Sequence, residues 1–195
     1  MRIISGEARG RRIFAPDGNN TRPTANRTRE ALFNILGPVR GLRFLDCFAG
    51  SGAVGLEAVS RGAACCLAFE KDPAAYRCIT RNAETVLRGC AGRYAPHRGD
   101  ILKHLEACRE EPFDIIYLDP PYDMTDLYGE VARIVLTRGL AAKDALFVFE
   151  TRTGTDIGTP GGLIETDTRR YGEATLRFYR IAEADDASGP REGDL

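Results

Sequence analysis

The sequence predicts an α/β fold in which helices cover both faces of a mainly parallel sheet. Between residues 43 and 150, short apolar runs alternate with longer segments of helical periodicity, a pattern typical of right-handed βαβ units. Between residues 163 and 181, two apolar runs are separated only by Tyr171-Gly172-Glu173, which indicates a closing antiparallel hairpin. The 195 residues are enough for one domain with a sizeable core.

The individual elements follow from the same periodicities. Buried strands are expected at residues 43–47, 65–70, 93–98, 115–119, 145–150, 163–168 and 174–181. Helices are expected at residues 51–61, 73–87, 101–109 and 125–137. The strands together predict a seven-stranded sheet that ends in the antiparallel pair.

A smaller unit is expected ahead of this core. The runs Arg2-Ile3-Ile4 and Arg12-Ile13-Phe14 flank a stretch with two glycines, which predicts a short β-hairpin. Thr24 is then expected to cap a helix that ends at Gly37-Pro38 and whose apolar stripe contains Ala31, Leu32, Ile35 and Leu36. We therefore divide the chain into an N-terminal extension at 1–40, a core at 41–182 and a disordered acidic tail at 183–195.

Composition favours a soluble protein, with 43% hydrophobic and 28% charged residues. No apolar run approaches the roughly 20 residues that cross a bilayer, and residues 1–12 lack the apolar stretch of a secretory signal, so a cytoplasmic location is expected. The six cysteines include no C-x-x-C pair and are expected to be reduced thiols. No metal-binding constellation is evident.

Charge is unevenly distributed although the net charge is only −1. Residues 1–43 contain nine arginines and three acidic residues, a local charge of +6, whereas residues 183–195 carry −4. Arginine richness alone does not establish RNA binding. A basic extension beside a catalytic core is nevertheless a candidate surface for phosphates.

A glycine-rich loop follows the first core strand in Leu45-Asp46-Cys47-Phe48-Ala49-Gly50-Ser51-Gly52. Closely spaced glycines allow a sharp turn and the close approach of a ligand. With Gly55 the loop also satisfies G-x-G-x-x-G, so the motif alone permits a nicotinamide or flavin cofactor. Asp46, at the strand's carboxyl end, would lie near a cationic sulfonium and aminoacyl group, which favours S-adenosylmethionine.

Two further acidic residues follow the next strands. Glu70 is placed to accept hydrogen bonds from both hydroxyls of an adenosine ribose, a role that does not by itself identify the cofactor. Asp100 could accept a hydrogen bond from the adenine amine, could cap the helix starting at Ile101, or could do both. The expected cofactor-binding residues are Asp46, Phe48, Ala49, Gly50, Ser51, Gly52, Glu70, Lys71, Asp100 and Ile101.

The apolar strand ending at Leu118 runs directly into Asp119-Pro120-Pro121-Tyr122. Ligands of open α/β sheets bind beyond the carboxyl ends of the strands, so this tetrapeptide faces the same crevice as the glycine loop. Two prolines fix the backbone and remove two donors, which leaves carbonyl acceptors. The Asp119 carboxylate and the Pro120 carbonyl could orient an exocyclic amine toward a methyl donor, and Tyr122 could stack on an extruded base. Termination of the strand at a surface turn is the alternative.

These motifs together resemble the bacterial methyltransferases that modify the N2 amine of one guanine in small-subunit (16S) ribosomal RNA. The resemblance runs from Met1 to about Ile181, and the cofactor loop and the tetrapeptide place it only within the class I S-adenosylmethionine-dependent superfamily. The narrower assignment depends on the opening arginine-rich segment, on Thr21-Arg22-Pro23-Thr24 with Arg27, and on the helix that follows.

The resemblance implies a Rossmann-like class I methyltransferase fold, S-adenosylmethionine as methyl donor, S-adenosylhomocysteine as product and no metal. It implies ribosomal RNA as partner, within a small-subunit assembly particle, and a monomeric protein without membrane contact. Asp119, Pro120, Pro121 and Tyr122 would form the catalytic tetrapeptide. The implied substrate-binding residues are Arg9, Arg11, Arg12, Arg22, Thr24 and Arg27.

Four other functions share parts of this pattern. A protein-amide methyltransferase more typically has asparagine where Asp119 stands and would not need the basic N-terminal extension. A DNA adenine or cytosine amino-methyltransferase would use the same loop and tetrapeptide but normally adds a sizeable target-recognition segment. A catalytically inert RNA-binding assembly factor would not need intact Asp46, Glu70 and Asp119. A nicotinamide dehydrogenase would bind NAD, which a binding measurement tests directly.

Overall fold

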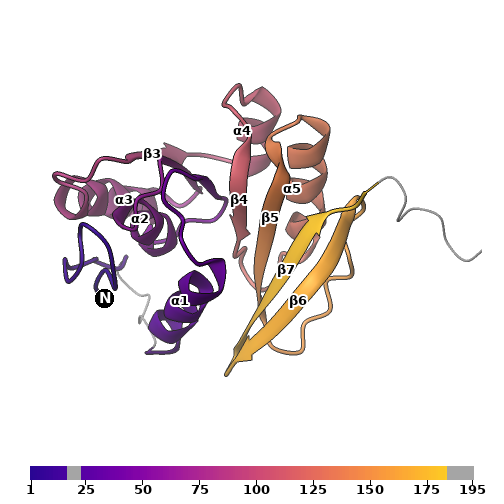
Figure 1. The fold of residues 1–195 in the computed structure, drawn as a ribbon, viewed down its shortest axis with the longest axis horizontal. Coiled ribbons are helices and arrows are strands. Elements are labelled where there is room, and N and C mark those ends of the chain that lie inside the picture. Colours follow the sequence, from indigo (N-terminus) through magenta and orange to yellow (C-terminus); the bar gives the residue numbers. More distant parts are fainter. Residues whose placement is uncertain (17–22, 184–195) are drawn as a thin grey trace, which may run out of the picture.

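In the computed structural model, which describes residues 1–16 and 23–183, helices cover both sides of a seven-stranded sheet (Figure 1). The helices are α1 (Pro23–Leu36), α2 (Ala53–Ser60), α3 (Pro73–Val86), α4 (Ile101–Ala107) and α5 (Asp126–Thr137). The strands are β1 (Arg43–Asp46), β2 (Cys65–Glu70), β3 (Arg93–Arg98), β4 (Phe113–Leu118), β5 (Ala141–Arg152), β6 (Leu163–Tyr171) and β7 (Ala174–Ile181). None of the described helices is long and apolar enough to cross a membrane.

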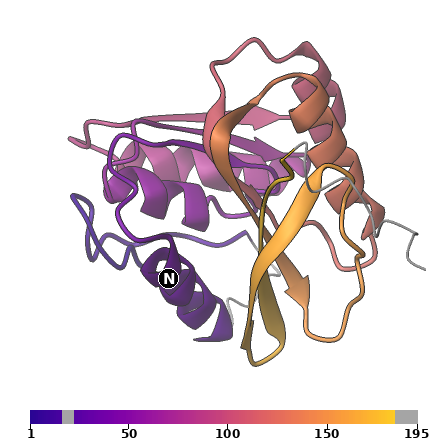
Figure 2. The same ribbon diagram turned by 45° about the vertical axis from the view of Figure 1, so that its right-hand side comes forward.

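The strand order is β3-β2-β1-β4-β5-β7-β6, with parallel pairing from β3 to β5. β7 runs antiparallel to both β5 and β6, which confirms the expected C-terminal hairpin. The chain order reverses between β1 and β4, so the crevice beyond the carboxyl ends of these two strands is the expected ligand site. Figure 2 shows the hairpin projecting beside the parallel strands.

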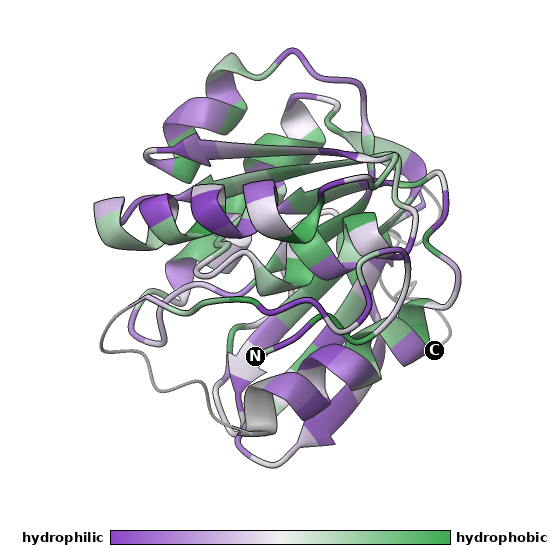
Figure 3. Ribbon diagram, turned by 90° about the vertical axis from the view of Figure 1, so that its left-hand side faces the viewer, coloured by the Kyte–Doolittle hydropathy of each residue, from purple (hydrophilic) through white to green (hydrophobic). Residues whose placement is uncertain are grey.

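Two apolar clusters explain the layers, because successive strand residues point to opposite faces. On one face Leu45, Ile116 and Phe147 pack with residues of α4 and α5. On the other, Phe44 and Ile115 pack with residues of α1, α2 and α3. The interior strands accordingly have apolar residues on both faces. Figure 3 shows hydrophobic residues along strands in the interior of the fold.

The ends of several elements differ from expectation for local reasons. α2 begins at Ala53 rather than residue 51, because Gly52 has φ of +78° and holds the chain in a left-handed turn. β5 begins at Ala141 rather than residue 145, because Ala141 pairs with Phe113 before a register shift.

The helix α1 differs from expectation in its start and in its buried side. It starts at Pro23, so Thr24 lies within the helix and is not its cap. Ile35 of the predicted stripe is exposed and Phe33 is buried instead.

The N-terminal segment, residues 1–16, forms the expected hairpin with one antiparallel bridge between Arg2 and Arg12. It is bound closely to the core: the backbone N–H groups of Ile4 and Ser5 donate to the buried carboxylate of Glu57 on α2. The added Cβ of a side chain at Gly6 would lie 1.8 Å from the Ser60 carbonyl oxygen. The segment is therefore packed against the helix that follows the glycine loop. The expected tail at 183–195 lies, from residue 184 onward, outside the described residues.

Candidate active site

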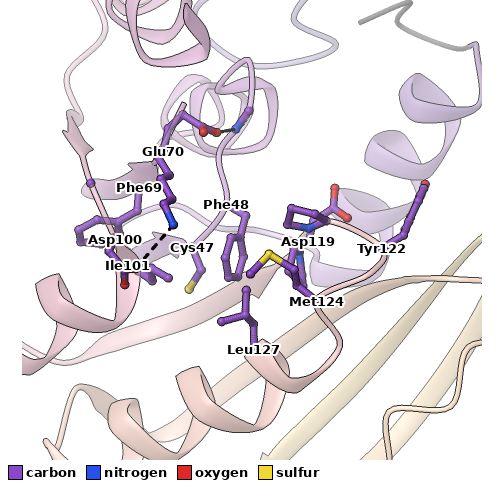
Figure 4. A pocket seen from close by; sticks show the side chains of 15 residues that line it. Cys47, Phe48, Phe69, Glu70, Asp100, Ile101, Asp119, Tyr122, Met124 and Leu127 are labelled. Atoms are coloured by element: carbon purple, nitrogen blue, oxygen red, sulfur yellow. Dashed lines mark hydrogen bonds and ion pairs between the residues drawn. The ribbon is translucent and has the colours of Figure 1, made fainter. Parts of the chain in front are cut away.

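Two adjoining cavities open beyond the carboxyl ends of the central strands. The larger, about 520 Å³, extends from the ends of β2 and β3 to the tetrapeptide after β4. The smaller, about 280 Å³, lies toward α1 and the N-terminal segment. Phe48, Gly50 and Asp119 line both cavities. In Figure 4, Glu70 and Asp119 lie on opposite sides of Phe48 in the larger cavity.

The glycine loop forms the wall between these cavities. The Ala49 N–H donates to the Phe69 carbonyl at 2.8 Å, which ties the loop to the end of β2. Gly50 has φ of +54°, and a Cβ added there would meet no atom within 4 Å. Since Gly50 lines both cavities, the backbone is open to a ligand at this position. Ser51 and Ala49 line the smaller cavity.

Glu70, at the end of β2, accepts the Gly50 N–H at 2.9 Å through one oxygen and the Asp72 N–H at 2.7 Å through the other. A carboxylate offers about four lone-pair sites, so both oxygens keep capacity for a ribose.

Asp100 accepts the Leu102 N–H and is the N-cap of α4. It also lines the larger cavity with Lys71 and Ile101, and Lys71 Nζ lies 4.0 Å from Asp100 Oδ2. Capping and ligand contact are thus compatible.

Asp46, the last residue of β1, is buried with one carboxylate oxygen unpaired among the described residues. Its other oxygen accepts the Gly55 N–H at 3.1 Å. Burial raises the pKa of Asp46 to about 7, an effect that the Gly55 hydrogen bond opposes and the nearby Glu70 charge reinforces. An unpaired buried acceptor in the smaller cavity indicates a cationic or hydrogen-donating ligand.

Asp119, immediately after β4, is half-buried and lines both cavities. Burial, with repulsion from Glu150 and Asp46, raises the pKa of the Asp119 carboxyl group well above the usual range.

The last two residues of the tetrapeptide, Pro121 and Tyr122, are exposed. Tyr122 retains 63% of its surface at the mouth of the larger cavity. The Pro121 carbonyl accepts the Met124 N–H at 2.9 Å. Of the two proline carbonyls expected to be free acceptors, the described backbone bonds therefore leave only that of Pro120.

Three polar side chains that line the smaller cavity were absent from the predicted site: Arg29, Tyr117 and Glu150. Tyr117 lies on β4 and Glu150 near the end of β5, and the Tyr117 hydroxyl donates to Glu150 Oε2 at 2.6 Å. The signal for Glu150 was available, since an acidic residue near the carboxyl end of a predicted strand is the pattern that identified Asp46 and Glu70. Arg29 is 4% exposed and lies 3.8 Å from Glu57.

The predicted substrate-binding arginines occupy different environments. Arg11 donates to the carbonyls of Val86 and Arg88 at 2.7 and 2.6 Å, so it holds the end of α3. Arg9 is exposed. Arg12 and Arg27, both exposed, line a shallow groove between the N-terminal segment and α1. Arg22 and the side chain of Thr24 lie outside what the structure describes.

Comparisons with known proteins show the family and the fold to which this chain is similar. Residues 1–180 match the family model described as Conserved hypothetical protein 95. The chain is 35% identical over 182 residues to ribosomal RNA small subunit methyltransferase D of Escherichia coli K12, covering 92% of this chain and 89% of that protein. The protein of the same name from Haemophilus influenzae is 30% identical, with 92% and 93% covered. A solved structure of a hypothetical protein from Thermus thermophilus superimposes with a TM-score of 0.73 at 35% identity, covering 93% of this chain and 99% of that one.

Proposed function

This chain belongs to the family described as Conserved hypothetical protein 95, and on that premise we propose that it methylates small-subunit ribosomal RNA with S-adenosylmethionine. The methyl acceptor is the exocyclic N2 amine of a guanine. The two relatives above are named as ribosomal RNA small subunit methyltransferases, which supports the substrate class. The observation that carries the reaction class is the position of Asp119 at the junction of the two cavities, beside the glycine loop.

The described residues fit the proposed methyl donor. When bound, S-adenosylmethionine supplies a methyl group on a cationic sulfur, which leaves as a neutral thioether. Glu70 and Asp100 would hold the nucleoside end in the larger cavity. The unpaired Asp46 oxygen and the open face of Gly50 suit the aminoacyl end.

The tetrapeptide would act by orientation and electrostatics. The exocyclic amine of a base is a weak nucleophile because its lone pair is delocalised into the ring. If the Asp119 carboxylate and the Pro120 carbonyl each accept one N–H, the lone pair can point at the methyl group. The raised pKa of Asp119 suits a group that then takes the proton the amine must lose. Tyr122, exposed at the cavity mouth, provides a stacking surface for an extruded base.

The groove lined by Arg12 and Arg27 would guide the RNA to this pocket. Exposed guanidinium groups bind phosphates and position a nucleic acid without reading its sequence. Arg9 lies on the same N-terminal hairpin and is likewise exposed. We extend the proposal to a monomeric enzyme that acts on an assembly particle of the small ribosomal subunit.

Two variants separate the cofactor and acceptor roles. Asp119→Ala should lower methyl transfer to ribosomal RNA by at least about 100-fold while cofactor affinity stays near wild type. Glu70→Ala should instead weaken S-adenosylmethionine binding by about 1 to 3 kcal/mol, through loss of a charged acceptor. Calorimetry gives the affinities, and mapping the methylated nucleotide in RNA from cells with and without the protein gives the product. Near-wild-type turnover by Asp119→Ala would refute the tetrapeptide assignment, and a methylated adenine or cytosine would refute guanine.

A further inference from the structure

Glu150 and Asp119 lie side by side at the ends of neighbouring parallel strands. β4 and β5 lie side by side (Figure 1). Leu118, the last residue of β4, pairs with Phe149 of β5, so the residue that follows each member of this pair is a carboxylic acid. Alternation places both acids on the face of α1, since Leu118 and Phe149 pack in the opposite cluster. Both line the smaller cavity. Neighbouring strands are about 4.8 Å apart, a separation over which two carboxylates can reach adjacent groups on one ligand edge.

The orientation of Glu150 is set by a neighbour on β4. The Tyr117 hydroxyl donates to Oε2 at 2.6 Å, and burial raises the pKa of Tyr117 so that the hydroxyl keeps its proton. Among the described residues Oε1 of Glu150 has no hydrogen bond and the carboxylate has no ion pair. Burial raises the pKa of Glu150 too, whereas the Tyr117 bond opposes that change. Oε1 of Glu150 can thus accept a hydrogen bond from a ligand, and the Tyr117 hydrogen bond to Oε2 fixes the orientation of the carboxylate.

The strand order decides which side of Asp119 faces the acceptor base. β4 lies between β1 and β5, so Asp119 has Asp46 and the glycine loop on one side and Glu150 on the other. The loop side is the proposed cofactor side. A base whose amine contacts Asp119 therefore presents its neighbouring ring atom toward Glu150.

Ring nitrogens next to exocyclic amines differ among the bases. In guanine the amine-bearing C2 adjoins N1–H, which is a donor, and N3, which is an acceptor, so one side of the amine offers a donor to a carboxylate. In adenine and cytosine the amine adjoins a ring nitrogen that is an acceptor. A carboxylate bonds to the first and repels the second, so an acceptor at this position discriminates by both attraction and repulsion.

We propose that Glu150, positioned by Tyr117, accepts the ring N1–H of the target base while Asp119 holds its exocyclic amine, and thereby selects guanine over adenine and cytosine. This inference rests on the proposed function. Glu150 is the specificity-determining residue, and Tyr117 is a positioning residue that acts through it.

A base analogue tests the inference without removing the amine. 2-Aminopurine keeps the amine of guanine at C2 but has an unprotonated N1. A synthetic RNA carrying the mapped target would be prepared with guanine or 2-aminopurine at that position, and kcat/KM measured for each. The wild-type protein should prefer guanine by about 1000-fold or more, because the analogue cannot donate to Glu150 and places its N1 lone pair against the carboxylate. Glu150→Gln should lower that preference at least about tenfold, because its amide N–H can donate to the bare N1.

Controls separate this inference from the proposed function. Tyr117→Phe should lower the preference less than Glu150→Gln, and Glu106→Gln, at an exposed carboxylate of α4, should leave it unchanged. Cofactor affinity should stay the same in all three variants. If the wild-type protein methylates the guanine RNA but Glu150→Gln keeps the wild-type preference, the inference is overturned and the function stands. If the wild-type protein methylates no guanine RNA, the proposed function itself fails.

Discussion

Buried carboxylates are hydrogen-bonded differently in two regions of the molecule, around the N-terminal segment and at the carboxyl ends of the strands. Around the segment, Glu57 is fully buried and accepts from Ile4, Ser5 and Arg61. At the strand ends Asp46 has an unpaired oxygen, and burial raises the pKa of the carboxyl groups of Asp46 and Asp119. Among the described residues both oxygens of the Glu57 carboxylate accept hydrogen bonds, whereas one oxygen of Asp46 accepts none.

A buried polar group without a partner costs free energy. The unpaired oxygen of Asp46 also lines a cavity, and both observations together make it a candidate for a ligand contact. Asn82 connects the two regions: its side chain donates to the carbonyls of Phe14 and Ser51 at 2.8 and 2.9 Å. The N-terminal segment thus supports the glycine loop from outside the cavity.

The largest expected loss of stability concerns Glu57 and the N-terminal segment. Glu57→Gln should destabilise the fold by about 3 kcal/mol, because Arg29 would then be a buried cation without its anionic neighbour. Urea unfolding measures the change, and Glu84→Gln on the exposed face of α3 is the matched control. Hydrogen exchange at Ile4 and Ser5 should accelerate. An unchanged midpoint would mean that the segment is not held through Glu57.

A second prediction concerns Asp46 at the end of β1 and the pH dependence of stability that it causes. The pKa of Asp46 is raised from 3.8 to about 7, so between these values the native state binds more protons than the unfolded state. Stability contributed by this group therefore falls as pH rises from about 4 to 7 and is constant above. Asp46→Asn, which can still accept the Gly55 N–H, should gain about 2 to 4 kcal/mol relative to wild type over that range.

Unfolding at a series of pH values without cofactor measures this gain, and exposed Asp144→Asn is the control for loss of one negative charge. Saturating S-adenosylmethionine should reduce the advantage of Asp46→Asn at about pH 8, above the raised pKa, because the cation stabilises the ionised carboxylate. A stability difference that is flat with pH would contradict the account of Asp46.

The smallest expected effect concerns the arginines of the hairpin, of which Arg11 is hydrogen-bonded to the core. Arg9 and Arg12 are exposed, whereas Arg11 already binds the end of α3. Replacing Arg9 and Arg12 with alanine should flatten the slope of log RNA affinity against log salt by about 1.4 to 1.8, at roughly 0.7 to 0.9 per phosphate contact. Arg11→Ala should lower stability and leave the slope unchanged. Equal slopes for the wild type and the double variant would exclude phosphate contacts by these two residues.

Most of the fold could be predicted from local patterns. The strands at Cys65–Glu70 and Arg93–Arg98 have the expected bounds, because their periodicity and flanking turns are local. The early start of β5 could not be predicted, since it depends on pairing with Phe113 on β4. The exposure of Ile35 was missed for the same reason: which stripe of α1 is buried depends on the sheet beneath it.

By itself the sequence determined which residues lie at the carboxyl ends of the strands, because strands and helices differ in the spacing of apolar residues, which is a local property of the sequence. That was enough to place Asp46, Glu70 and Asp119 in one crevice. Only the tertiary structure decided that Glu150 is beside Asp119 and bound to Tyr117, since these contacts depend on strand order and register. It likewise decided that Arg11 is bound to α3 whereas Arg12 faces a groove. These contacts could not be predicted from the sequence, because a hydrogen bond between residues far apart in the chain produces no periodic pattern of residue types.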